Sequence, residues 1–187
     1  MIEIRIATGA DVDRVRSVHL CAFPEGEREI VSNLAVALLS EDASPNIISL
    51  VAEVKGAIVG HVAYSPVTLE NGKKFLGYIL APLAVRPEWQ KRGTGSQLVK
   101  DGIRRLSSMG VEIVFVYGDP KYYGRFGFTV EGAERFEPPY TPRSAIRWEG
   151  ARDRGSSRDP HRDRPPRRRS VPPRRSRSGR SCRVPRA

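Results

Sequence analysis

Alternating apolar and polar residues predict the first strands of the chain. Residues 2–7 (IEIRIA) alternate in the manner of a half-buried strand. Residues 46–54 (NIISLVAEV) and 57–69 (AIVGHVAYSPVTL) are longer apolar stretches, and the dipeptide KG between them suits a tight turn that joins antiparallel strands. Residues 75–85 (FLGYILAPLAV) continue the pattern after a polar turn. Three consecutive strands are therefore expected to form a meander.

Apolar residues at helical spacing predict two helices after the first strand. The sequence TGAD at residues 8–11 fits a capping box that begins the first helix, and residues 28–40 (REIVSNLAVALLS) fit the second. The positions expected to face the core are Val12, Val15, Val18, Cys21 and Ala22 in the first helix, and Ile30, Leu34, Ala37 and Leu38 in the second. Residues 21–29 (CAFPEGERE) are expected to be a charged loop between them.

The second half of the chain predicts a crossover between two parallel strands. A helix is expected over residues 94–109, with a buried face of Leu98, Val99, Ile103 and Leu106 and with Gly110 ending it. An apolar strand at 111–118, a short helical turn after Asp119 and a strand at 128–133 follow, and Phe126 and Phe128 are expected in the core. The element order is β-α-α-β-β-β-α-β-α-β, which predicts an α/β (α+β) fold with a mixed sheet.

Charge divides the chain into two segments. The formal net charge is +11, but residues 143–187 contain 16 Arg, no Lys and 4 acidic residues, whereas residues 1–142 contain 16 basic and 17 acidic residues. We therefore expect a nearly neutral folded domain over 1–142 and a disordered Arg/Pro/Ser-rich tail over 143–187. Such a tail would bind nucleic acid or anionic lipid, or it is the product of a frameshift. Residues 145–149 (AIRWE) are its one candidate strand.

Cysteine usage and hydropathy predict the compartment. The two cysteines, Cys21 and Cys182, suggest no disulfide framework, and the N-terminus lacks a basic region followed by an apolar core. No charge-free apolar run approaches the roughly 20 residues of a membrane-spanning helix. A soluble cytoplasmic protein is expected, without a membrane partner and without residues assigned to a metal.

Residues 90–95 (QKRGTG) form a glycine-containing loop between a predicted strand and a predicted helix. Glycines there let the backbone N–H groups of residues 91–96 converge on one point, and the positive end of the helix adds to their attraction for an anion. The alternative is an ordinary turn at the start of a helix, with Lys91 and Arg92 as a solvated basic edge. The spacing fits neither a Walker A loop nor the full dinucleotide fingerprint.

The stretch LAVRPEWQKRGTGSQLV resembles the acetyl-CoA loop of the GNAT acyltransferases, of the small bacterial N-acetyltransferase type, and the predicted element order is also theirs. The resemblance covers about residues 2–140. It implies a GNAT-like fold and acetyl-CoA as co-substrate, with the pyrophosphate on the loop amides and the pantetheine arm along the preceding strand. The residues to which it gives these roles are Leu83, Ala84, Val85, Gln90, Lys91, Arg92, Gly93, Thr94, Gly95 and Ser96.

A second match to the family is YYGRFGF at residues 122–128, which is similar to its Tyr-x-x-x-Gly-Phe segment. Tyr123 aligns with the tyrosine that protonates the departing CoA thiolate in many members, and Tyr122 is a neighbouring hydroxyl with the same chemistry. Alternatively, both rings pack the short helix onto the sheet.

The resemblance implies an N-acetyltransferase in which an amine attacks acetyl-CoA directly in a ternary complex. The attack requires a deprotonated amine, and Glu70, His61, Glu25 and Glu27 are candidate bases, although each is as readily a surface or structural residue. The acceptor amine is not readable from the sequence, and a homodimer is common in the family. The alternative function is a CoA-binding or nucleic-acid-binding module without catalysis.

Overall fold

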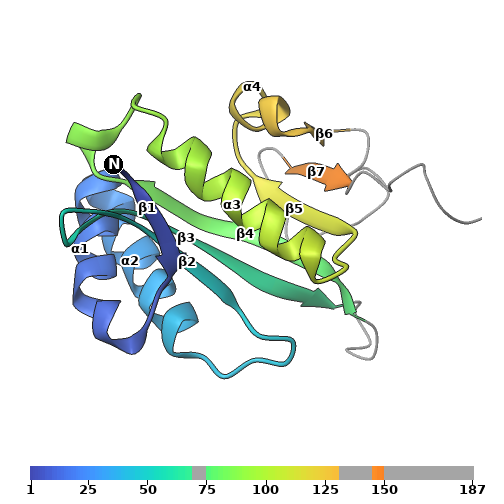
Figure 1. The fold of residues 1–187 in the computed structure, drawn as a ribbon, viewed down its shortest axis with the longest axis horizontal. Coiled ribbons are helices and arrows are strands. Elements are labelled where there is room, and N and C mark those ends of the chain that lie inside the picture. The colour runs from blue at the N-terminus through green and yellow to red at the C-terminus, as the bar shows by residue number, and fades with distance from the viewer. Residues whose placement is uncertain (69–74, 131–144, 150–187) are drawn as a thin grey trace, which may run out of the picture. The chain divides into compact units, whose positions relative to one another are not determined.

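The computed structural model describes residues 1–68, 75–130 and 145–149, all within a compact unit that spans Met1–Arg152. Its strands and helices follow the predicted order, with one more strand at the end (Figure 1). The bounds are β1 Glu3–Ile6, α1 Val12–Ala22, α2 Glu25–Ser40, β2 Ile48–Val54, β3 Ala57–Thr68, β4 Phe75–Val85, α3 Thr94–Ser108, β5 Ile113–Tyr117, α4 Pro120–Tyr123, β6 Phe128–Thr129 and β7 Ala145–Glu149. Three short 3₁₀ turns are η1 Gly9–Asp11, η2 Pro87–Trp89 and η3 Gly124–Phe126.

The described strands form one mixed sheet in the order β1-β2-β3-β4-β5-β7-β6. Every neighbouring pair is antiparallel except β4 and β5, which are parallel because α3 crosses over between them. The predicted mixed sheet is thus confirmed. The segment AIRWE, the candidate strand of the expected tail, pairs as β7 with both β5 and β6. Val130 of the predicted last strand lies outside β6, and residues 131–133 and 150–187 lie outside the described part.

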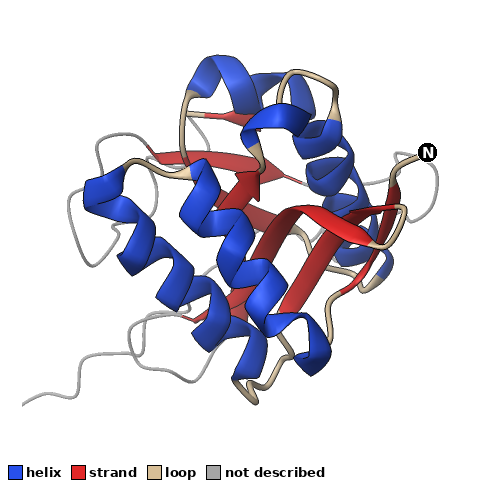
Figure 2. Ribbon diagram, turned by 90° about the vertical axis from the view of Figure 1, so that its left-hand side faces the viewer, coloured by secondary structure: helices blue, strands red, loops and turns tan. Residues whose placement is uncertain are grey.

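Helices cover the two faces of the sheet, with α1 and α2 side by side on one face and α3 on the other (Figure 2). The α3 side contains the larger core cluster, in which Leu98, Val99 and Leu106 of α3 are fully buried, as the spacing predicted. The α1 side contains a second cluster, in which Val15 and Val18 are fully buried. Each face of the sheet therefore has its own core cluster, one under α3 and one under α1 and α2.

The buried face predicted for α1 is correct at the centre of the helix and wrong near its C-terminal end. Val15 and Val18 are buried, but Cys21 is exposed and the polar His19 takes the buried position at the end of the helix. The physical reason is a partner: His19 bonds to a histidine of β3, which a pattern of apolar residues does not reveal.

The apolar face predicted for α2 was also wrong. Ile30 and Leu34 are 73% and 45% exposed, while the buried positions are Ser32 and Ala35. Small side chains let packed helices approach closely, so Ser32 and Ala35 occupy the buried side while Ile30 and Leu34 face outward. The helix also begins at Glu25, within the segment expected to be a loop.

Among the described residues, no helix is long and apolar enough to cross a membrane. The same residues contain no group of three or more His, Cys, Asp or Glu side chains that could hold a metal ion.

Candidate functional site

Strands β4 and β5 run together for only part of the length of β4. Their pairing joins residues 78–80 to residues 114–116, whereas the opposite edge of β4 stays paired with β3 as far as Val85. At the point of separation Ala81 and Pro82 lie opposite the single residue Ala63 of β3, which is a bulge that bends the strand. A gap therefore opens between β4 and β5 next to residues 83–85.

The register of β4 decides which backbone groups face this gap. The N–H of Arg86 donates to the carbonyl of Val59 at 2.9 Å, and in an antiparallel ladder the inward- and outward-facing residues alternate. The backbone groups of Ala84 are therefore turned toward His61 of β3, and those of Leu83 and Val85 are turned toward the gap. Of the three strand residues that the resemblance selected, two offer their backbone to a ligand and Ala84 does not.

The loop after β4 is shaped by its own side chains. Lys91 and Gly93 have positive φ, at 57° and 85°, so the chain makes a sharp turn before α3. The Gln90 side-chain amide donates to the Val85 carbonyl at 3.0 Å, and the buried Thr94 hydroxyl donates to the Trp89 carbonyl at 3.0 Å. Gln90 and Thr94 thus fix the loop with their side chains.

The first turn of α3 presents backbone donors. The first helical hydrogen bond runs from Gln97 N to Gly93 O at 2.9 Å, so the three preceding amides, at residues 94–96, have no partner within the helix. The helix of 15 residues adds its positive end at the same place. Backbone N–H groups without a helical partner and the positive end of a helix both favour an anion at this place.

Two adjoining pockets connect this helix end to the gap beside β4. One, of about 310 Å³, is lined by Lys91, Gly93, Gly95, Ser96, Tyr122 and Arg125. The other, of about 290 Å³, is lined by Leu83, Val85, Gln90, Lys91, Gly95 and Tyr122. They share Lys91, Gly95 and Tyr122, so the two pockets lie next to each other. We call the pair the loop–strand trough.

The two candidate tyrosines differ in where they lie. Tyr122 lines both pockets of the trough, and a Cβ atom on Gly95 would come within 2.7 Å of its hydroxyl oxygen. Tyr123 is 8% exposed and lies among aromatic rings, with ring centroids 4.9 Å from Tyr122 and 5.7 Å from Phe128. Burial, and secondarily the neighbouring Tyr122, raise the pKa of Tyr123 well above its usual value. Tyr122 therefore lines the trough, and Tyr123 does not.

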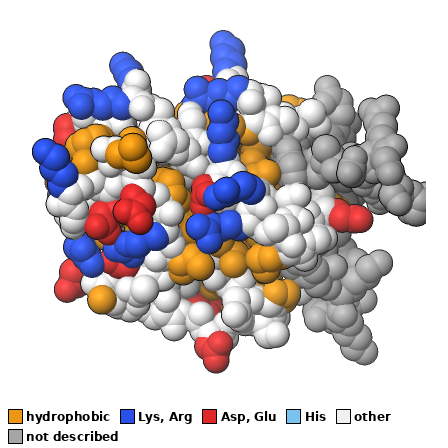
Figure 3. Space-filling view, in the orientation of Figure 1, with side chains coloured by type: hydrophobic (Ala, Val, Ile, Leu, Met, Phe, Trp, Pro, Cys, Tyr) orange, Lys and Arg blue, Asp and Glu red, His pale blue; other side chains and the backbone are white. Residues whose placement is uncertain are grey.

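Arg125 is a residue of the trough that sequence reasoning missed. Its guanidinium carbon lies 4.0 Å from the centre of the Tyr122 ring, so the cation is stacked at the mouth of the anion site. The spacing of three residues from Tyr122 in a helical turn was the available signal. Arg92 instead stacks on Trp89 at 5.5 Å and lines neither pocket. Figure 3 shows Lys and Arg side chains along the edge of the molecule formed by the loop and α4.

None of the described candidate bases lines the trough. His61 is fully buried, with Nδ1 2.8 Å from His19 Nε2 and Nε2 2.8 Å from Ser49 Oγ. Both of its ring nitrogens are therefore occupied, and burial lowers its pKa to about 3. Glu25 and Glu27 lie exposed in the first turn of α2. Glu70 lies outside the described residues.

Comparison with known proteins shows which family the chain resembles in sequence. Residues 3–130 match the family model of the acetyltransferase (GNAT) domain. An uncharacterized N-acetyltransferase of Escherichia coli (strain K12), YjhQ, is 35% identical over 137 residues, which cover 72% of this chain and 74% of YjhQ. A second one from the same strain, YhbS, is 36% identical over 90 residues, which cover 48% of this chain and 53% of YhbS.

Solved structures agree in fold. The GNAT family N-acetyltransferase YhbS from Escherichia coli, crystallised with CoA, has a TM-score of 0.64 at 27% identity and covers 79% of this chain and 81% of its own. A GNAT family acetyltransferase from Brucella melitensis, crystallised with acetyl-CoA, has a TM-score of 0.58 at 30% identity and covers 80% and 97%. On the family match and these relatives, the chain belongs to the GNAT acetyltransferase family.

Proposed function

We propose that the protein transfers the acetyl group of acetyl-CoA to an amine by direct attack within a ternary complex. The observation that carries this proposal is the loop–strand trough, which joins the free amides of the first turn of α3 to the unpaired edge of β4. A ligand that has an anion at one end and amides along its length fits such a trough, and CoA is such a ligand. Relatives crystallised with CoA and acetyl-CoA support the same choice.

The pyrophosphate would lie on the amides of residues 94–96. Lys91 and Arg125 flank these donors, so the two cations would add attraction at the mouth of the site. The pantetheine arm would then follow the edge of β4, where the backbone groups of Leu83 and Val85 are turned toward the gap. It would pair there as an added strand does. The Val85 carbonyl already accepts a bond from Gln90, so Leu83 offers the freer pair of groups.

Binding of this kind would bring the thioester to the gap between β4 and β5. The amine nitrogen attacks the carbonyl carbon of the thioester, a C–N bond forms, and the C–S bond breaks when the tetrahedral intermediate collapses. The amine loses one proton, and the sulfur leaves as a thiolate that takes up another. Fixing the thioester in place lowers the entropic part of the barrier.

A hydroxyl beside the departing sulfur would supply the proton. We assign this role to Tyr122 before Tyr123, because Tyr122 lines the trough and Tyr123 is packed among Phe128 and other rings. The resemblance of the segment 122–128 to the family motif supports Tyr123 instead, and the two phenylalanine variants described in the Discussion separate these assignments.

The experiment is an acetylation assay on the full chain with acetyl-CoA and a panel of amines, in which free CoA thiol is measured. The panel includes small amines, amino acids, aminoglycosides, peptide N-termini and lysine side chains. Thiol release that depends on one class of amine is the expected result. Calorimetric binding of acetyl-CoA without release for any amine would favour a binding module, and no binding would refute the proposal.

A further inference from the structure

Arg86, the first residue after β4, is bonded to two other elements, β3 and α1. Its N–H donates to the Val59 carbonyl of β3 at 2.9 Å, and its Nε donates to the Ile58 carbonyl at 3.2 Å. Its Nη2 donates to the Ser17 hydroxyl of α1 at 2.8 Å, and Nη1 lies 3.8 Å from the sulfur of Cys21. One guanidinium therefore joins the end of β4 to β3 and to α1.

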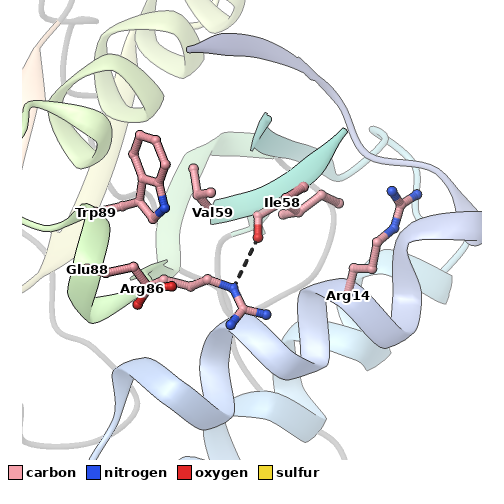
Figure 4. A pocket seen from close by; sticks show the side chains of 7 residues that line it. Arg14, Ile58, Val59, Arg86, Glu88 and Trp89 are labelled. Carbon is pink, nitrogen blue, oxygen red and sulfur yellow. Dashed lines mark hydrogen bonds between the residues drawn. The ribbon is translucent and has the colours of Figure 1, made fainter. Parts of the chain in front are cut away.

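Figure 4 shows the bond from Arg86 to the Ile58 carbonyl in a hollow of about 320 Å³, which is lined by Arg14 of α1, the start of β3 and the segment after β4. The guanidinium of Arg86 is turned toward α1, and Trp89 closes the other side. The donors at Nε and Nη2 are directed into protein acceptors, so these two groups hold the guanidinium in a fixed place. A planar guanidinium reaches two acceptors at a fixed angle, which a lysine ammonium cannot do.

The position of Arg86 links this joint to the loop–strand trough. The backbone N–H of Arg86 continues the β3–β4 register that turns Leu83 and Val85 toward the gap, and the side chain of Arg86 ties this end of β4 to α1. The loop begins immediately afterwards and returns through Gln90 to the Val85 carbonyl. Movement of Arg86 would therefore displace both the strand edge and the amides of the loop.

We propose that Arg86 is a positioning residue that holds the end of β4 and the loop against α1, and that it thereby sets the affinity for CoA. Arg86 lines neither pocket of the trough, so it acts through Val85 and the loop. The inference rests on the proposed function in that CoA is the ligand of the trough.

The test is calorimetric titration of the full chain with CoA, with thermal melting of each variant beside it. Arg86→Met is expected to weaken CoA binding about tenfold, because small displacements of binding groups are costly. Arg86→Lys keeps the positive charge but loses the planar guanidinium that reaches two acceptors, so it should weaken CoA binding to a similar extent. Ser17→Ala should weaken CoA binding less than the Arg86 variants do. Ser17→Thr, which keeps the hydroxyl, should bind CoA as the unaltered chain does.

The matched control is Arg16→Met on the same helix. Arg16 bonds to Glu29 and Asn33 of α2 and, within the described part of the chain, not to β3 or β4, so its loss should leave the dissociation constant unchanged. Wild-type affinity in Arg86→Lys together with weak binding in Arg86→Met would show that charge alone matters and would overturn the proposal. Wild-type affinity in both variants would also overturn it. Failure of the unaltered chain to bind CoA would instead refute the proposed function.

Discussion

His19 and His61 are bonded to each other across the interface between α1 and β3, with Nε2 of the first 2.8 Å from Nδ1 of the second. Ser49 of β2 completes the chain, 2.8 Å from His61 Nε2. A single proton is shared between the two rings, and in either tautomer Nδ1 of His19 has no hydrogen-bond partner among the described residues. Both rings are fully buried, so the interface between α1 and the sheet depends on two neutral imidazoles.

We expect stability to fall on mild acidification. Burial lowers the pKa of His19 to about 4 and that of His61 to about 3, below the value of roughly 6.5 in an unfolded chain. As the pH falls from 6.5 toward 4, the unfolded state therefore binds more protons than the folded state. The free energy of unfolding should decrease by about 1.4 kcal/mol per pH unit for each histidine. Urea denaturation at several pH values between 7.5 and 4.5 measures this slope.

The titration of Asp11 does not contribute to this slope between pH 7.5 and 4.5. The hydrogen bond from Arg5 holds the pKa of Asp11 far below its usual value, so the stability that Asp11 contributes is lost only below a pH of about 4. An equal slope in a chain that lacks both histidines would contradict the assignment.

Removal of one member of the hydrogen-bonded chain His19–His61–Ser49 should lower the free energy of unfolding more than replacement of all three members by apolar residues. His61→Leu leaves His19 Nε2 and the Ser49 hydroxyl unpaired in the interior, which we expect to cost about 1–3 kcal/mol per group. The triple variant His19→Phe/Ser49→Ala/His61→Leu removes all three groups and keeps a ring beside Phe23. It should unfold at a higher urea concentration than His61→Leu, and the reverse order would show that the polar chain stabilises the fold.

Gly95 and Tyr122 should be coupled in CoA binding. A Cβ on Gly95 would lie 2.7 Å from the Tyr122 hydroxyl, so Gly95→Ala pushes the ring into the trough and should weaken CoA binding about tenfold. The next contacts, with Val85 Cγ2 at 3.5 Å and Tyr122 Cζ at 3.9 Å, are ordinary. The pair Gly95→Ala/Tyr122→Phe should therefore bind CoA as Tyr122→Phe alone does. Additive losses in the calorimetric cycle would show that no contact links the two residues.

The two tyrosines should separate in steady-state kinetics. Tyr122→Phe is expected to lower kcat about 100-fold with little change in the KM for acetyl-CoA, because it removes a proton donor and keeps the ring. Tyr123→Phe should keep most of kcat, since its ring lies in the aromatic cluster with Phe128. The opposite result would give the acid role to Tyr123, as the family motif indicates.

Gly102→Ala should destabilise the protein although it lies within a helix. Alanine usually stabilises a helix by about 1 kcal/mol over glycine, but a Cβ at Gly102 would overlap the ring of Tyr64. That ring is fully buried, and its hydroxyl donates to the Val99 carbonyl at 3.1 Å, so it cannot move aside. We expect a loss of about 1–3 kcal/mol in the free energy of unfolding. Gly26→Ala in α2, with no atom near its Cβ, is the control and should be neutral or stabilising.

The parts of the fold that depend on local pattern were predictable from the sequence. The KG turn is present as expected, with positive φ at Lys55 and Gly56, and α3 begins at Thr94 as its spacing indicated. The buried side of α2 was not predictable, because it depends on how closely α1 approaches. Ser32 and Ala35 are chosen for the interface by size, which apolar periodicity does not measure.

The site shows the same division between local and tertiary information. The loop glycines and the strand before them could be found from spacing, since a turn, a strand end and a helix start are local features. The choice between Tyr122 and Tyr123 could not be made, because adjacent helical residues point about 100° apart and only the placement of α4 decides which faces the trough. The histidine pair was invisible for a similar reason, since 42 residues separate its members.

The part of β4 that follows residues 78–80 is not paired with β5, so one side of it is an edge although the strand lies within the sheet. Edges at the rim of a sheet invite pairing with other protein chains and so promote aggregation. Here β5 runs beside β4 at residues 78–80 and diverges only afterwards, so an approaching polypeptide strand would meet β5 after pairing with two or three residues. A thin, flexible guest meets no such obstacle. The divergence of the two strands thus limits the length of edge that another polypeptide could pair with, while it leaves backbone groups turned toward the gap.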